Sequence, residues 1–72
     1  MTTLEMLLAR YGGPHMNTAQ LAECFGFKCS KNVLEAVRHQ RFPVRTFVLG
    51  SRRVADIRDV AEYIDKQRAE AA

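Results

Sequence analysis

The residues best suited to chemistry in this sequence are basic, and most of them lie in one stretch, residues 28–53. Seven of the eleven lysines and arginines fall there: Lys28, Lys31, Arg38, Arg41, Arg45, Arg52 and Arg53. Glu35 is the only acid of the stretch, and both flanking segments carry more acids than bases. Ammonium and guanidinium groups bind phosphate oxygens, and such a concentrated positive field is typical of a nucleic-acid-binding surface. An ordinary solvated basic face is the alternative.

Other kinds of chemistry find little support in the sequence. Cys24 and Cys29 are five residues apart, and two thiolates do not complete a tetrahedral zinc site. His15 and His39 match no zinc-finger spacing. We therefore expect two unpaired, partly buried thiols, with no metal and no cofactor. No nucleophile–base pair or phosphate-binding glycine loop is present, so an enzyme is not predicted.

Length and composition limit the size and location of the protein. Its 72 residues, 47% of them hydrophobic, predict one small folded domain that spans residues 1–72. No apolar run approaches the roughly 18 residues that a membrane span needs, and the N-terminus has no signal-peptide pattern. We expect a cytoplasmic, nucleoid-associated protein without membrane contact.

A first helix is predicted near the N-terminus. Thr2 and Glu5 form a capping-box pattern, and the apolar residues that follow recur at helical spacing: Leu4, Leu7, Leu8 and Tyr11. Gly12, Gly13 and Pro14 end this helix. It is interpreted either as a packing helix or as a self-association surface.

Two helices joined by a short turn are predicted next. The first, residues 19–25, is capped by residues 17–18 and ends at Gly26. The second begins at an N-cap, Ser30, and runs to about Gln40. This order is that of a helix-turn-helix.

The outward face of the second helix carries groups that can contact DNA bases. Val33, Leu34 and Val37 are expected to face inward. The outward positions are then Lys31, Asn32, Glu35, Arg38 and His39. Asparagine pairs with adenine, glutamate accepts from cytosine, and basic side chains contact guanine or phosphate. Residues 30–32 are expected to enter the groove first.

A β-hairpin is predicted after the break at residues 41–43. Residues 44–48 alternate as a strand, with Val44, Thr46 and Val48 on one face, Gly50 permits a tight turn, and residues 53–55 return. Its tip carries Ser51, Arg52 and Arg53. Such a wing suits phosphates or the minor groove, while a merely stabilising hairpin is the alternative. Asp56 then caps a last helix with an apolar stripe formed by Ile57, Val60, Ala61 and Ile64.

The predicted fold is therefore α+β, mostly α: a winged helix-turn-helix with an extra N-terminal helix, a two-stranded wing and a C-terminal helix. The candidate DNA-binding residues are Lys28, Ser30, Lys31, Asn32, Glu35, Arg38, Arg41, Arg45, Ser51, Arg52 and Arg53.

The chain resembles two families of small regulators. Residues 17–66 are similar to the AlpA/excisionase-like winged helix-turn-helix group, which is related to the DNA-binding domain of MerR-type regulators. The motifs that carry this likeness are residues 18–22, Gly26, Ser30, residues 41–43, residues 50–54 and residues 58–64. Residues 7–13 and 61–65 also resemble the pyocin activator (PrtN-like) family of prophage-associated regulators.

The resemblance implies a DNA-binding protein of prophage or mobile-element origin. The main expectation is an excisionase that binds and bends attachment-site DNA to promote integrase-mediated excision. The alternative is a transcriptional regulator of phage or pyocin-type genes, and a lesser one is a protein–protein adaptor. The expected partners are double-stranded DNA, further copies of the chain on repeated sites or as a dimer, and an integrase.

Overall fold

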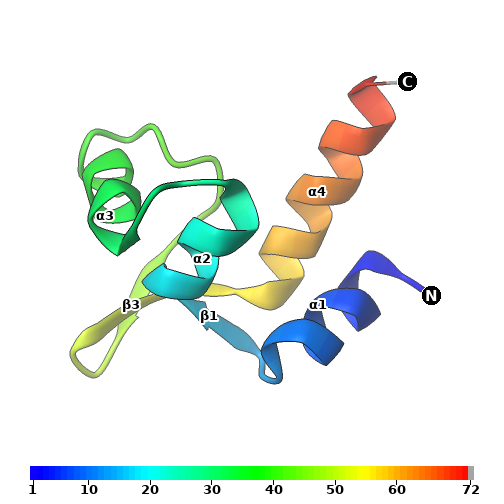
Figure 1. The fold of residues 1–72 in the computed structure, drawn as a ribbon, viewed down its shortest axis with the longest axis horizontal. Coiled ribbons are helices and arrows are strands. Elements are labelled where there is room, and N and C mark those ends of the chain that lie inside the picture. Colours follow the sequence, from blue (N-terminus) through cyan, green and yellow to red (C-terminus); the bar gives the residue numbers. More distant parts are fainter. Residues whose placement is uncertain (72) are drawn as a thin grey trace.

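The protein folds into four helices and a three-stranded antiparallel sheet (Figure 1), as described by a computed structural model for residues 1–71. The elements are α1 (Thr3–Tyr11), β1 (His15–Asn17), α2 (Thr18–Phe25), α3 (Ser30–Arg38), β2 (Phe47–Leu49), β3 (Arg52–Asp56) and α4 (Ile57–Ala71). The helix-turn-helix is α2–α3 and the wing is β2–β3, which confirms the predicted fold class. The last residue of the predicted domain, Ala72, lies outside the described residues.

The elements divide into two sides. In Figure 1, α3 and the hairpin of β2 and β3 lie on the left, α1 and α4 on the right, and α2 in the middle. The largest fully buried side chains are Met16, Leu21, Val33 and Val60, which come from β1, α2, α3 and α4. One core therefore holds both sides together, and burial of apolar area is the main force that fixes their relative position.

Helix α1 begins and ends as predicted. The Thr2 hydroxyl accepts from the Glu5 backbone N–H, and the Glu5 carboxylate accepts from the Thr2 N–H. Gly12 takes a left-handed conformation at the other end, with φ 79°. Leu7 is buried, but Leu8 remains 41% exposed, so the apolar face that packs is narrower than expected. The helix packs against α4, and the Thr3 hydroxyl donates to the Asp65 carboxylate.

Strand β1 was not expected from the sequence. It pairs with β3, and Met16 lies opposite Ala55, both fully buried. The strand order is β1-β3-β2, so β3 is central and the wing continues directly from the core sheet. The strand has three residues, and the last, Asn17, is also the N-cap of α2, so it is too short to show the alternation by which strands are recognised.

The helix-turn-helix differs from its prediction at both ends of α3. The N-cap is Cys29, whose side chain makes no capping hydrogen bond, and Ser30 is the first helical residue. At the other end Gln40 adopts a left-handed φ of 56°, and the Arg41 N–H donates to the Ala36 carbonyl at 2.7 Å. This is the Schellman arrangement that terminates helices, and it stops α3 at Arg38 rather than Gln40.

An aromatic cluster fixes the loop that leads from α3 to the wing. Phe42 contacts Phe25 at the end of α2, with ring centroids 5.1 Å apart, and Phe27 in the turn at 5.9 Å. Phe25 also stacks on Tyr63 of α4 at 5.7 Å. Because these rings come from both sides of the molecule, the cluster couples the position of α3 to α4.

The wing is shorter on its first strand than predicted. Val44 is buried in the loop before β2, which begins only at Phe47, whereas Val48 is 53% exposed. The prediction that Val44 and Val48 lie on one face of the same strand was therefore wrong. Leu49 pairs with Arg52 around the Gly50–Ser51 turn, and Gly50 has φ 64°, as a tight hairpin requires.

Asp56 links the wing to α4 and gives a testable pH dependence. Its Oδ1 accepts from the Arg58 backbone N–H at 2.8 Å, and its Oδ2 from Arg58 Nη2 at 2.7 Å. These hydrogen bonds lower the pKa of Asp56 from 3.8 to about 2. A lowered folded-state pKa stabilises the fold above pH 3.8, and this stabilisation is lost as the pH falls toward 2.

We therefore expect Asp56→Asn, which keeps an acceptor for the cap, to reduce the free energy of unfolding at pH 7 by about 1 kcal/mol. This value is discounted for the solvent exposure of Arg58. The difference from wild type should shrink to nothing near pH 2. Urea titrations at pH 7, 4 and 2 measure the difference in the free energy of unfolding between Asp56→Asn and wild type. A difference that stays constant with pH would show that the Asp56 carboxylate does not stabilise the fold through Arg58.

Candidate nucleic-acid interface

Helix α3 and the wing line one open hollow. The hollow has a volume of about 540 Å³. Its walls are Leu34 of α3, Val48 of β2, residues 51–53 at the wing tip and residues 17–19 at the start of α2. Figure 1 shows α3 and the wing on the side of the molecule away from α1 and α4. Helix α3 and the wing therefore flank the same recess.

The outward face of α3 carries the predicted base-contacting residues. Lys31, Asn32 and Arg38 are exposed, while Glu35 is half-buried. Glu35 Oε2 lies 3.5 Å from Arg38 Nη2 and 3.4 Å from His39 Nε2. The carboxylate thus offsets part of the positive charge at the C-terminal end of α3, and the N-terminal half keeps its positive charge at Lys31.

The two wing arginines have different environments. Arg52 is exposed at the tip, next to exposed Ser51. Arg53 is half-buried, and its Nη1 donates to Thr46 Oγ1 at 2.8 Å. The Arg53 hydrogen bond therefore links β3 to the residue just before β2. The guanidinium of Arg52 is exposed to solvent.

Of the predicted residues, Ser51, Arg52 and Arg53 line this hollow, and the others, including Lys31, Asn32, Glu35 and Arg38 of α3, do not. Lys28 and Ser30 line a separate depression of about 300 Å³ at the α2–α3 turn, beside Glu23. Exposed Arg41 follows the end of α3. Arg45 lines a third depression, with Asp59 and Glu62 of α4. Arg45 thus lines a different depression from the wing tip, and the charged residues that share it are Asp59, Glu62 and Lys66.

The structure adds residues that the sequence did not single out. Residues 17–19 at the start of α2 and two exposed apolar side chains, Leu34 and Val48, line the hollow. The only signal for Leu34 was its spacing, three residues after Lys31 and four before Arg38, which places it on the same helical face. Because Leu34 is apolar, it was predicted to face the core instead.

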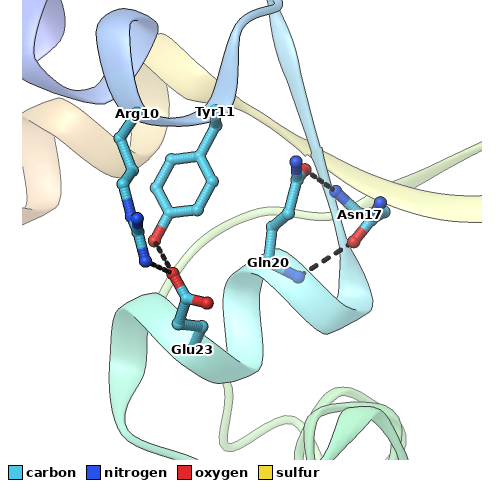
Figure 2. Close-up of polar contacts among 5 residues, drawn as sticks. All are labelled: Arg10, Tyr11, Asn17, Gln20 and Glu23. Atoms are coloured by element: carbon cyan, nitrogen blue, oxygen red, sulfur yellow. Dashed lines mark hydrogen bonds and ion pairs between the residues drawn. The ribbon is translucent and has the colours of Figure 1, made fainter.

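Polar contacts hold α1 against the first helix of the helix-turn-helix (Figure 2). Arg10 and the Tyr11 hydroxyl both reach Glu23 of α2, the hydroxyl at 3.3 Å. Glu23 raises the pKa of Arg10, and burial raises that of Tyr11, so both keep their protons at neutral pH. In the same view Asn17 and Gln20 form the capping box that starts α2. These contacts orient α2, which in turn positions α3.

Two unpaired, partly buried thiols were predicted, and the partial burial holds for Cys24 but not for Cys29. Both cysteines are unpaired; Cys24 is half-buried and Cys29 is exposed. Among residues 1–71, no helix has the length and apolarity needed to cross a membrane.

The α2–α3 pair, the β2–β3 wing and the basic residues on α3 and the wing define a winged helix-turn-helix protein. Comparison with family models gives a match to "Pyocin activator protein PrtN" over residues 3–71, and the chain belongs to this family. Pyocin activators are regulatory proteins, not a class of enzymes. No curated protein and no solved structure matches the chain. The likeness to the PrtN-like family is thereby confirmed, and the match favours regulation over the excisionase expectation.

Proposed function

We propose that this chain is a DNA-binding transcriptional activator of phage-type genes, such as pyocin genes, and that residues 1–72 act as one DNA-binding domain. The observation that carries the proposal is that Leu34 of α3 and the wing tip line one hollow, and that Lys31, Arg38 and Arg52 are exposed on these two elements. Membership of the pyocin activator family supports the regulatory role.

In the proposed complex α3 lies in the major groove, whose width of about 12 Å admits a helix. Ser30, Lys31 and Asn32 approach base edges, and Arg38 contacts base or phosphate with Glu35 setting its direction. The wing tip, with Ser51 and Arg52, contacts the neighbouring backbone or minor groove. Lys28 and Arg41 extend the positive field along the duplex. Arg45 contributes least, because acidic residues of α4 lie beside it.

The size of the chain favours binding by several copies. A single module of this kind buries roughly 600–1,000 Å² of protein surface on DNA, which limits its affinity. We therefore propose cooperative binding at repeated sites or as a dimer. Direct repeats beside an attachment site would instead indicate excision together with an integrase, whereas sites next to a promoter indicate activation.

Arg52→Ala tests the wing. Removing one exposed phosphate-contacting guanidinium should weaken binding to all duplexes and lower the slope of log K against log salt by about 0.9. Fluorescence anisotropy at several salt concentrations measures the slope. Arg68→Ala, which removes the same charge from an exposed position on α4, is the matched control and should leave the slope unchanged. Equal slopes for Arg52→Ala and wild type would show that the wing tip does not contact DNA phosphates.

A further inference from the structure

Two exposed apolar side chains lie inside the basic hollow. Leu34 is 44% exposed and Val48 is 53% exposed, and they come from different elements, α3 and β2. Both line the recess together with Arg52 and Arg53. Single exposed apolar residues are common on protein surfaces, but two that converge from separate elements on one recess form a patch.

The charges around this patch limit what it can contact. Lys31 and Arg38 share the exposed face of α3 with Leu34, and Arg52 stands across the hollow at the wing tip. A ligand seated there must be anionic around its edge and apolar at its centre. Val48 lies opposite Arg53 in the strand register, and the Arg53 hydrogen bond to Thr46 holds that part of the wing in place.

Duplex DNA containing thymine has this combination. The thymine 5-methyl is the apolar group that base pairs present in the major groove, and phosphates flank it on both sides. RNA does not offer the same target, because uracil lacks the methyl group and the major groove of an RNA helix is too deep and narrow for side chains.

We propose that Leu34 and Val48 form an apolar contact for a thymine methyl group, and so make this protein prefer thymine at a defined position of its site. The inference rests on the proposed DNA-binding function and adds the base that is recognised. Leu34 contacts the methyl group from α3, and Val48 contacts it from the wing.

The test replaces single thymines with deoxyuridine, which removes one methyl group and keeps base pairing. The probe is a duplex selected by the wild-type protein from a random-sequence library. At one or two positions the substitution should weaken wild-type binding about 4-fold, the effect of exposing one buried methyl group. Leu34→Ala should bind the thymine duplex about 4-fold more weakly and no longer distinguish thymine from deoxyuridine there. Leu8→Ala, a leucine on α1 with similar exposure, should still distinguish them.

Three outcomes would overturn the inference. Salt-dependent binding with equal affinity for every deoxyuridine duplex would leave the proposed function intact and remove the thymine contact. A Leu34→Ala protein that keeps wild-type discrimination would show that the methyl group is read elsewhere. A dimer in sedimentation that Leu34→Ala dissociates, with DNA affinity unchanged, would assign the hollow to a second copy of the chain. Absence of any DNA binding would instead contradict the proposed function itself.

Discussion

Replacing Met16 with alanine should lower the free energy of unfolding by about 2–5 kcal/mol. Met16 is fully buried on β1 opposite Ala55, where its side chain joins the sheet to the helices of the core. Truncation removes buried apolar atoms and leaves a cavity that the surrounding side chains fill only in part. A small domain has a total stability of roughly 5–15 kcal/mol, so this substitution should remove a large share of it.

The control for this prediction is Met6→Ala, because Met6 lies on α1 and is 48% exposed. We expect a change within about 0.5 kcal/mol there. Urea denaturation followed by circular dichroism measures both variants. Equal effects of the two substitutions would mean that β1 is not part of the core sheet.

Replacing Asn32 with alanine should reduce the discrimination between a specific and a random duplex by about 1–3 kcal/mol. Asn32 is exposed in the first turn of α3, where the residues of a reading helix usually meet base edges. An asparagine amide can form two hydrogen bonds to adenine, and alanine can form neither. Binding to random DNA should change little, because that binding depends on phosphates.

Competition binding with a selected and a scrambled duplex gives the discrimination directly. Gln67→Ala, an amide removed from an exposed position on α4, serves as the control and should keep the wild-type ratio. If Asn32→Ala also keeps it, then Asn32 does not contact a base in the bound complex.

The helices could be predicted because their signals are local. The Thr2–Glu5 capping box, the Gly26 stop and the apolar spacing of α4 depend only on neighbouring residues, and all three are present in the structure. The turn at Gly50 was predictable for the same reason. Such features need no knowledge of the rest of the chain.

The errors arose where tertiary contacts decide the outcome. β1 exists because residues 15–17 pair with β3, some forty residues later in the sequence. Helix α3 ends early because Gln40, rather than a glycine, takes the left-handed position. Leu34 was predicted to face inward and Val48 to share a strand face with Val44, but both line the hollow between α3 and the wing. The sequence contains no local sign of such a recess.

The basic character of the candidate interface could be predicted from the sequence, but the environments of its side chains could not. The basic residues cluster in positions 28–53, the part of the chain that forms α3 and most of the wing. The sequence did not indicate that Arg53 donates a hydrogen bond to Thr46, or that Arg45 lines a depression with Asp59 and Glu62. These differences leave Lys31, Asn32 and Arg52 as the residues most available to DNA.

The most direct test of the central claim is to map the DNA-binding surface by amide chemical-shift changes on titration with a duplex of about 15 base pairs. If α3 and the wing bind DNA, the largest changes should fall in residues 30–39 and 47–54, with little change in the outward face of α1 and the C-terminal half of α4. Changes concentrated in α1 and α4 would contradict the account, because they would place DNA on the opposite side of the molecule.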